Sequence, residues 1–319
     1  MVDEDFHLRA DFKVLHDMRK DYKSIAIGIP TYNREAFVNA NATSLRNARF
    51  PNYCDVNFLV VDDASVDFNT TYLESVYPAG SRIFQRKENS GSADLAICDL
   101  FKRCLELDTD AILLLDSDLI VNKDFIDKGL ALLKNTDGVV SLFNTSNHPV
   151  AEDHGELVVK RSVGSAGTLW DRRLAEEIAK NIASGPRWDW RFSSYINSTD
   201  RKLYCARNSL VQHIGYCEGQ NSSLNSGDYG IGFVDSGFEN IFITLESIVR
   251  AQIRLGGQLA AHENLHPFAN EQAVLDNLAR RLVELEQRTA KLEKYSVRMR
   301  LRRLIHSLKR YVPATQQAR

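Results

Sequence analysis

Two aspartates stand two residues apart at the end of a short apolar run. Asp116 and Asp118 follow Ile112–Leu115, so both side chains can reach one ligand where the chain leaves this predicted strand. Two carboxylates would repel an anionic phosphate unless a divalent cation lay between them. Oxygen ligands favour Mg²⁺ or Mn²⁺, and an added imidazole favours Mn²⁺. The pair therefore predicts a metal site, with an ordinary capped turn as the alternative.

A third aspartate lies between two large aromatic residues. Asp189 is flanked by Trp188 and Trp190, which can remove water from the carboxyl group, raise its pKa and form a wall for a sugar ring. A carboxylate of this kind is suited to accept a proton from a hydroxyl group. The alternative is that Asp189 caps the helix predicted through Phe192 to Tyr195, and one carboxylate can do both.

A competing motif occurs further along the chain. His262 to His266 read HENLH and match HExxH, the helical motif of zinc hydrolases. Pro267 directly afterwards disfavours helical geometry at His266, and Gly256 and Gly257 interrupt the run before it. Chance is a sufficient explanation of this match. The sequence also lacks the phosphate loop of kinases and the GxGxxG of dinucleotide-dependent oxidoreductases.

Short apolar runs alternate with helical patterns through the first half of the chain. A helix is predicted at 92–107, and strands are predicted at 24–29, 56–61, 82–85, 111–115 and 139–143. This alternation implies an α/β fold with a mainly parallel sheet and helices on both faces. Residues 157–163 predict a further strand and 171–182 a further helix, and Glu218 to Gly237 have the composition of a loop.

Polar residues follow three of the predicted strands. They are the segments 30–34, 62–63 and 116–118. Ligands of open α/β sheets bind outside the carboxyl ends of the strands. These three segments are therefore expected to build one site for a sugar, a base or a metal-bound phosphate.

Composition narrows the class of protein. The chain has 319 residues, of which 44% are hydrophobic and 26% are charged, values typical of soluble globular proteins and not of collagen or disordered chains. Its five cysteines contain no CxxC, which favours buried free thiols over disulfides or a thiolate zinc site. No apolar run approaches the roughly 20 residues of a membrane span. With acidic residues at its start, the sequence predicts a cytoplasmic protein.

The end of the chain carries the opposite charge to the rest. Residues 271–319 hold 12 basic and 5 acidic side chains. Heptad leucines over 275–299 predict a short coiled coil and with it a homo-oligomer. Residues 298–312 combine an apolar stripe with arginines and lysines. This pattern fits a helix that lies on the anionic surface of a membrane, at the inner face of that membrane. The alternative is a helix packed on the main domain, and no nucleic-acid partner is predicted.

Four motifs in order resemble a known family. IGIPTYNREAF, VVDDASVD, ENSGSADLAI and LLLDSDLIV, spread over Ile25 to Val121, resemble the nucleotide-sugar half of a family-2-type glycosyltransferase with the GT-A fold. VGSAGTLW, WDWRFSSYI and SLVQHIG, between Gly164 and Ser223, resemble the acceptor half of related enzymes. The implied organisation is a leading amphipathic helix at 1–23, a catalytic domain at 24–250 divided into 24–121 and 122–250, and a helical tail at 251–319.

The resemblance also implies roles for individual residues. Asp118 and His213 would hold the Mn²⁺ or Mg²⁺ ion, and Asp189 would be the general base that deprotonates the acceptor hydroxyl. Asp189 departs from the commoner pattern, which has an acidic pair at this position. The residues assigned to the nucleotide sugar are Pro30, Thr31, Asn33, Arg34, Asp62, Asp63, Asn89, Gly91, Asp116 and Ser117.

The predicted function is transfer of a sugar from a nucleotide diphosphate donor, with UDP as the expected nucleotide, to an acceptor hydroxyl with inversion. The basic tail suggests a lipid-linked or cell-surface glycan as acceptor. Two alternatives stay open. One is a sugar nucleotidyltransferase, which would release pyrophosphate, and the other is a noncatalytic carbohydrate-binding or assembly protein on the same fold.

Overall fold

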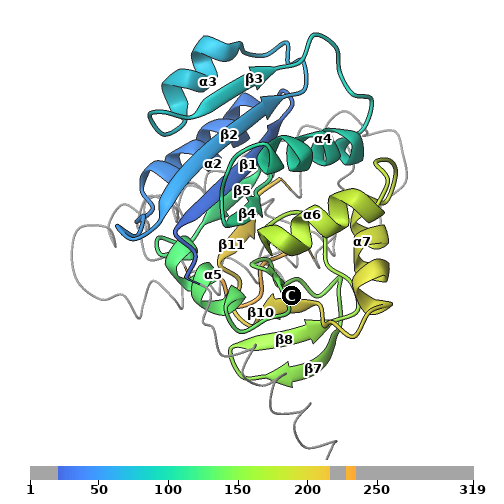
Figure 1. Ribbon diagram of the computed structural model, residues 1–319. Coiled ribbons are helices and arrows are strands. Elements are labelled where there is room, and N and C mark those ends of the chain that lie inside the picture. Colours follow the sequence, from blue (N-terminus) through green and yellow to red (C-terminus); the bar gives the residue numbers. More distant parts are fainter. Residues whose placement is uncertain (1–20, 216–227, 235–319) are drawn as a thin grey trace, which may run out of the picture. The chain divides into compact units, whose positions relative to one another are not determined.

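A nine-stranded sheet forms the centre of the part of the protein that the computed structural model describes, residues 21–215 and 228–234 (Figure 1). Its strands lie in the order β3 (Arg82–Gln85), β2 (Asp55–Asp62), β1 (Ser24–Thr31), β4 (Ala111–Leu114), β9 (Thr168–Asp171), β6 (Val139–Ser141), β10 (Tyr204–Ala206), β8 (Leu157–Lys160) and β7 (Val150–His154).

Most strands of this sheet run in one direction. β3, β2, β1 and β4 are parallel neighbours, and β10 is parallel to β6. β9 runs antiparallel to β4 and β6, and β8 runs antiparallel to β10 and β7. The predicted mainly parallel α/β sheet is confirmed. A second, two-stranded sheet pairs β5 (Leu119–Val121) with β11 (Val211–His213).

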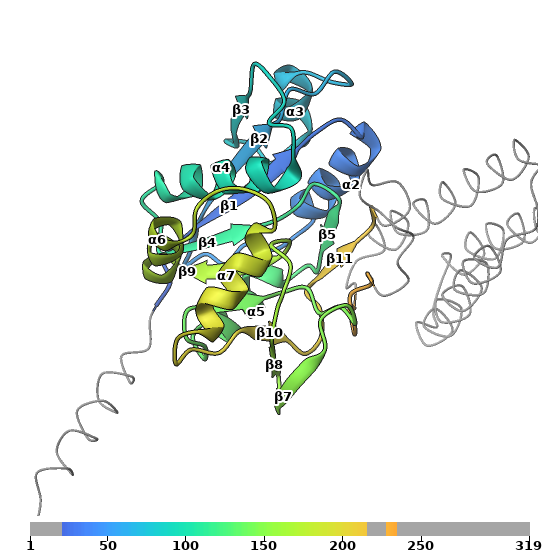
Figure 2. The same ribbon diagram turned by 90° about the vertical axis from the view of Figure 1, so that its right-hand side faces the viewer.

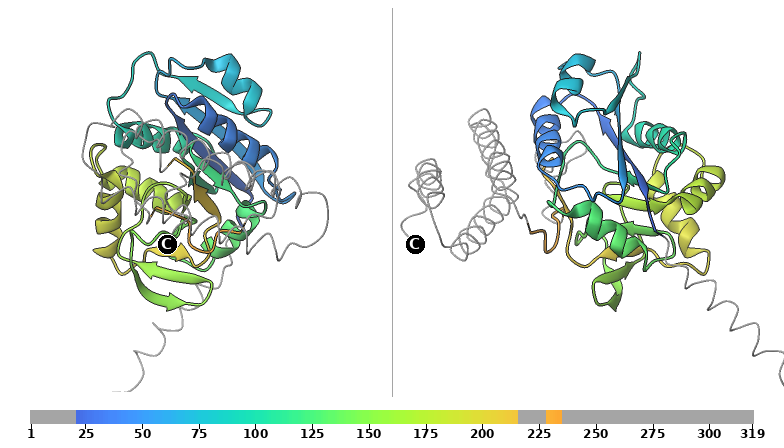
Figure 3. Two further views of the ribbon diagram at one scale, coloured as in Figure 1. Left: turned by 180° about the vertical axis from the view of Figure 1, so that it is seen from behind. Right: turned by 60° about the vertical axis from the view of Figure 1, so that its left-hand side comes forward.

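Helices cover both faces of the large sheet. They are α2 (Glu35–Arg46), α3 (Thr70–Val76), α4 (Ala93–Leu105), α5 (Phe125–Leu133), α6 (Arg172–Asn181) and α7 (Trp188–Asn197). One apolar core contains side chains of α2, α3 and α5, and the other contains side chains of α4, α6 and α7. The right-hand view of Figure 3 shows blue α2 and green α5 on one side of the strands and α4 and α6 on the other.

The central strands supply both cores because their side chains alternate between the two faces. In β1, Ile25, Ile27 and Ile29 join one core and Ala26 joins the other. Strands buried on both faces are near-continuous apolar runs, which is why β1 and β4 are recognisable in the sequence. Ser92 caps α4 by accepting a hydrogen bond from the Leu95 N–H at 3.2 Å.

The sequence and the structure agree on the stronger elements. The five strands predicted before residue 144 correspond to β1, β2, β3, β4 and β6, and the run at 157–163 corresponds to β8. The helices predicted at 92–107 and 171–182 are α4 and α6. Five strands were not predicted, namely β5, β7, β9, β10 and β11. β7 and β8 form a hairpin at the lower end of the sheet in Figure 2.

Several predictions lie outside the described residues. They are all but the last three residues of the helix at 1–23, most of the loop from Glu218 to Gly237, the motif at 262–266, and the tail at 251–319 with its segments 275–299 and 298–312. Of the cysteines, Cys54, Cys98, Cys104 and Cys205 are buried free thiols, as predicted. None of the described helices is long and apolar enough to cross a membrane.

Substituting Gly28 tests how closely α4 packs on β1. A Cβ atom at this position would lie 2.6 Å from Cys104 Sγ and 3.0 Å from Leu100 Cγ. We expect Gly28→Ala to lower the free energy of unfolding by about 1–3 kcal/mol, because overpacking strains a close-packed core. Urea unfolding measures this loss. Gly164→Ala is the control, since its Cβ would meet nothing within 4 Å, and Cys104→Ala should partly rescue Gly28→Ala.

Candidate active site

The carboxyl ends of three neighbouring strands meet at one edge of the large sheet. Thr31, the last residue of β1, lies in register with Asp62, the last residue of β2, and Pro30 lies in register with Val61. On the other side of β1, the Leu115 N–H donates to the Gly28 carbonyl at 2.9 Å, directly before Asp116. The three polar segments predicted to share a site therefore leave the sheet at the same edge.

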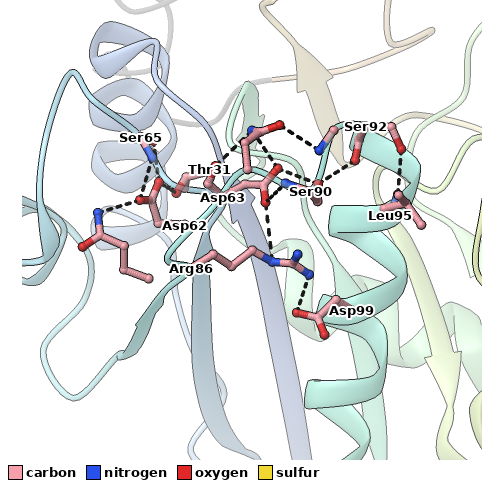
Figure 4. A network of polar contacts seen from close by, with 12 residues as sticks. Thr31, Asp62, Asp63, Ser65, Arg86, Ser90, Ser92, Leu95 and Asp99 are labelled. Carbon is pink, nitrogen blue, oxygen red and sulfur yellow. Dashed lines mark hydrogen bonds and ion pairs between the residues drawn. The ribbon is translucent and has the colours of Figure 1, made fainter.

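Asp62 is fully buried and holds this edge together (Figure 4). Its Oδ1 accepts hydrogen bonds from the hydroxyl groups of Thr31, at 3.0 Å, and Ser65. Its Oδ2 accepts from the Ser65 N–H and from Gln85 Nε2, both at 3.0 Å. Because four donors from three segments converge on it, Asp62 fixes the ends of β1, β2 and β3 relative to one another.

Asp63 is also buried, and it fixes the predicted nucleotide-binding turn. Its Oδ2 accepts hydrogen bonds from Asn89 Nδ2 at 3.0 Å and from the Ser90 hydroxyl at 2.6 Å, and its Oδ1 accepts from the Ser90 N–H at 2.9 Å. Arg86 lies 3.5 Å from Asp63 Oδ1 and forms a 2.8 Å ion pair with Asp99 of α4 (Figure 4). The turn is thereby tied to both β2 and α4.

Three of the predicted nucleotide-binding residues have left-handed backbone conformations. Gly91 has φ of +84°, which glycine adopts without a steric penalty, whereas Asn33 (φ 50°) and Arg34 (φ 59°) need support. Asn33 Oδ1 accepts the Val66 N–H at 2.8 Å, and the Arg34 N–H donates to Asp67 Oδ2 at 3.0 Å. The loop after β2 therefore holds the turn after β1 in place.

Asp118 is buried between two cationic side chains. Arg34 Nη1 lies 2.9 Å from Asp118 Oδ2, and His213 Nε2 lies 3.3 Å from the same oxygen. Burial opposes ionisation of Asp118, but His213 and Arg34 outweigh it and hold the pKa of Asp118 below its usual range. Arg34, which the resemblance assigns to the nucleotide sugar, contacts Asp118 through its guanidinium group.

The small sheet explains how His213 reaches Asp118 across the sequence. β5 begins directly after Asp118 and pairs antiparallel with β11, which places His213 opposite Leu119. The Ile214 N–H then donates to the Asp118 carbonyl at 2.9 Å. Pairing of two three-residue strands thus brings the two predicted metal ligands together.

Asp116 lies on the same turn with its Oδ1 atom buried. No described residue forms a hydrogen bond with this atom. Burial, and then the nearby charge of Asp118, raises the pKa of Asp116 to about 7. The turn itself is held by Asn41 of α2, whose Nδ2 donates to the Leu119 carbonyl at 2.7 Å, and Ser117 is buried within it. The Oδ1 atom of Asp116 is therefore available to bind a ligand.

Asp228 is a site residue that the sequence analysis missed. Its Oδ2 lies 2.7 Å from Nδ1 of His213, on the opposite side of the imidazole ring from Asp118. Burial lowers the pKa of His213, but the two carboxylates outweigh it and raise the pKa to about 10. A carboxylate on the second nitrogen is the usual support of a metal-binding histidine. Asp228 lies in a segment that reads as a loop, so its sequence context gave no signal.

The chemistry of these side chains fits a divalent cation. Asp118 and His213 offer an oxygen and a nitrogen to one point, and the unpartnered Oδ1 of Asp116 lies on the same turn. Within residues 21–215 and 228–234, no three acidic, histidine or cysteine side chains form a complete metal cluster. A cation held by Asp118 and His213 would therefore complete its coordination with oxygens of the donor and water.

Asp189 lies in the first turn of α7, which confirms the predicted helix there. Its Oδ1 accepts the Trp190 N–H at 2.8 Å, and the residue is half-buried. Burial is the main cause of a raised pKa at Asp189, and the charge of Asp94 adds to it. The raised pKa that the sequence predicted is therefore present, and it suits a group that takes up a proton.

The two tryptophans beside Asp189 have different environments. Trp188 is 2% exposed and packs against Phe101 and Phe192, with ring centroids 5.1 and 5.0 Å away. Trp190 is 55% exposed, and its ring centroid lies 6.2 Å from that of His148. The predicted aromatic wall is therefore wrong for Trp188, which is a core residue, and only Trp190 offers a face to a ligand.

Comparison with known proteins identifies the first part of the chain. Residues 26–162 match the family model described as glycosyl transferase family 2. This segment is a family 2 glycosyltransferase domain. None of the curated proteins compared with the chain is a significant match.

The matched segment covers the predicted nucleotide-sugar half almost completely and ends within the predicted acceptor half at 122–250. It includes every residue assigned to the nucleotide sugar, together with Asp118, whereas Asp189 and His213 lie beyond it. The glycosyltransferase resemblance inferred from the motifs in Ile25 to Val121 is thus confirmed. The roles of the individual residues stay predictions.

Solved structures similar to the chain include two of S. aureus TarS residues 1–349. The complex with UDP is 16% identical with a TM-score of 0.45, and the complex with UDP-GlcNAc is 19% identical with a TM-score of 0.46. Each alignment covers 71% of this chain, and the chain spans 65% and 66% of those two chains.

Proposed function

We propose that the protein transfers a sugar from a nucleoside diphosphate donor, with UDP as nucleotide, to a hydroxyl acceptor with inversion at the anomeric carbon. The observation that carries the proposal is the position of Asp118, faced by Arg34 and His213, where the strand ends of a family 2 glycosyltransferase domain meet. The unpartnered Asp116 oxygen at this place supports it.

The donor would bind along this edge of the sheet. The turns at 30–34 and 89–91 would hold the nucleoside, and Asp118 and His213 would hold Mn²⁺ or Mg²⁺. A divalent cation there supplies positive charge to the departing diphosphate. Arg34 already lies on Asp118 and would add a second positive group on the same side.

Asp189 would act on the acceptor. It would accept the proton of the attacking hydroxyl as the bond from that oxygen to the anomeric carbon forms. The bond from the anomeric carbon to the diphosphate oxygen breaks, and its electron pair leaves with the nucleoside diphosphate. Attack opposite the leaving group inverts the anomeric centre. The raised pKa of Asp189 favours such proton uptake.

The acceptor and assembly remain sequence predictions. A lipid-linked or cell-surface glycan is the proposed acceptor, and residues 298–312 would bind an anionic membrane while 275–299 join copies of the chain. We expect deletion of 271–319 to reduce the molecular mass of the protein in solution by light scattering and to abolish sedimentation with vesicles of anionic lipid at low salt. A monomeric intact chain that ignores such vesicles would contradict both proposals.

A screen of nucleotide sugars tests the proposed function. The protein is incubated with UDP-, GDP- and TDP-hexoses and Mn²⁺, and water serves as a slow acceptor. Release of free nucleoside diphosphate is the expected result. Pyrophosphate formation from a nucleoside triphosphate and a sugar phosphate would instead identify a nucleotidyltransferase. Absence of both turnover and binding would favour a noncatalytic protein on this fold.

A further inference from the structure

Helix α7 carries Asp189, and the residue that precedes this helix does not cap its first turn. Arg187, which precedes the helix, has a left-handed backbone (φ 56°), and its side chain forms no capping hydrogen bond. The first N–H groups of a helix have no partner inside the helix and need an acceptor from elsewhere. A non-glycine residue in this conformation also needs support from its surroundings.

The acceptor comes from another helix. Asp94, in the first turn of α4, accepts the Arg187 N–H on Oδ2 at 2.9 Å and the Trp188 N–H on Oδ1 at 3.4 Å. Both oxygens of one carboxylate therefore bind the turn that leads directly into Asp189. A carboxylate at a helix N-terminus is also favoured by the helix dipole.

Asp94 is itself fixed to the proposed donor side of the site. Its helix begins at the Ser92 cap, one residue after the turn at 89–91 that Asp63 holds. The Ser90 hydroxyl contacts both Asp63 Oδ2 and the Ser92 carbonyl, at 2.6 and 3.0 Å. A continuous set of hydrogen bonds thus runs from the end of β2 through this turn to α4.

Apolar contacts hold the bodies of the two helices together independently of Asp94. Phe101 of α4 packs against Trp188, which in turn packs against Phe192. These rings belong to the same buried core as the rest of α4, α6 and α7. Removing the Asp94 carboxylate should therefore free the first turn of α7 without separating the helices.

We propose that Asp94 is a positioning residue that ties the first turn of α7, and with it Asp189, to the donor-binding turn. This inference rests on the proposed function, in which the donor lies at 89–91 and Asp189 acts on the acceptor. The two reacting groups must be held in a fixed relation, because small misplacements of a catalytic group cost large factors in rate. Asp94 fixes this relation because its side chain binds the first turn of α7 and only two residues separate it from the turn at 89–91.

The test compares Asp94→Ala, Asp94→Asn and a matched control. Asp171 is the control, because it also caps a helix on this face, accepting the Arg173 N–H at 3.1 Å. It lies opposite Ala111, at the start of β4 and so at the far edge of the sheet. Amide hydrogen exchange of 187–190 is measured in the full chain, together with calorimetric affinity for UDP and Mn²⁺ and the rate of UDP release from the UDP-sugar found by the screen.

We expect Asp94→Ala to speed exchange at 187–190 at least tenfold and to reduce turnover at least tenfold, with UDP affinity within about twofold of the wild type. Asp94→Asn keeps an acceptor oxygen and should recover part of both losses, and Asp171→Ala should change neither quantity. Unchanged exchange in Asp94→Ala, or a loss of turnover matched by a loss of UDP affinity, would overturn the inference. If the wild type turns over no nucleotide sugar, the proposed function fails, whereas the exchange of 187–190 still decides whether Asp94 anchors α7.

Discussion

Asp189→Asn is expected to abolish most sugar transfer while leaving donor binding intact. Asparagine has the same shape and can still accept the Trp190 N–H, so the first turn of α7 should be unchanged. It cannot take up the proton of the acceptor hydroxyl. General-base catalysis contributes about 10² to 10⁴ in rate, so release of nucleoside diphosphate should fall by that factor. Calorimetric affinity for the donor should stay within about twofold.

The control for this variant is Asp200→Asn, which removes an exposed carboxylate beyond the other end of α7. It should have wild-type turnover. Wild-type turnover in Asp189→Asn itself would instead point to a different base or to a retaining reaction. Such a result would leave the donor-binding side of the proposal in place.

The rate of sugar transfer by the wild type should fall as the pH is lowered. A general base works in its deprotonated form, so activity is present above the pKa of Asp189 and is lost as the pH falls through it. Burial and the charge of Asp94 raise that pKa, so the acid limb of the kcat profile should lie above the roughly 3.9 of an exposed aspartate. The limb should be missing from the residual activity of Asp189→Asn.

The sequence predicted those site residues whose position is set by the end of a strand. Thr31, Asp62 and Asp116 end apolar runs, and parallel strands bring such ends to one edge whatever the loops do. The residues that hold these groups could not be predicted in the same way. Gln85 and Ser65 bind Asp62 only because β3 and the loop after β2 fold back onto it. Nothing in their local sequence marks them.

The unpredicted strands have a similar explanation. β5 and β10 are three residues long, too short to show the alternation that distinguishes a strand from a buried turn. β5 is nevertheless the strand that brings His213 to Asp118. Trp188 was misjudged because the prediction used only its nearness to Asp189 in the sequence. On a helix, residues two apart point in nearly opposite directions, so Trp188 enters the core and Trp190 faces solvent.

Asp118→Asn is expected to remove the dependence of donor binding on a divalent metal. The substitution keeps the volume of the side chain but removes the charge that faces His213 and Arg34. Altering even the outer partners of a metal ligand typically costs 10- to 100-fold in metal affinity, and loss of the ligand itself should cost at least as much. UDP is titrated with Mn²⁺ and with chelator into both proteins. The wild type should lose affinity in chelator, and the variant should be weak in both.

Two further variants separate the charge of Asp118 from its position. Asp124→Asn removes an aspartate that follows β5 and lies 3.5 Å from Arg49, and it should behave as the wild type. Gly215→Ala leaves the Asp118 carboxylate chemically intact, but a Cβ atom at residue 215 would overlap it. We expect Gly215→Ala also to weaken metal-dependent UDP binding at least tenfold. Equal UDP affinity with Mn²⁺ and with chelator in the wild type would rule out the metal site, whereas metal dependence that survives in Asp118→Asn would assign the ion to other ligands.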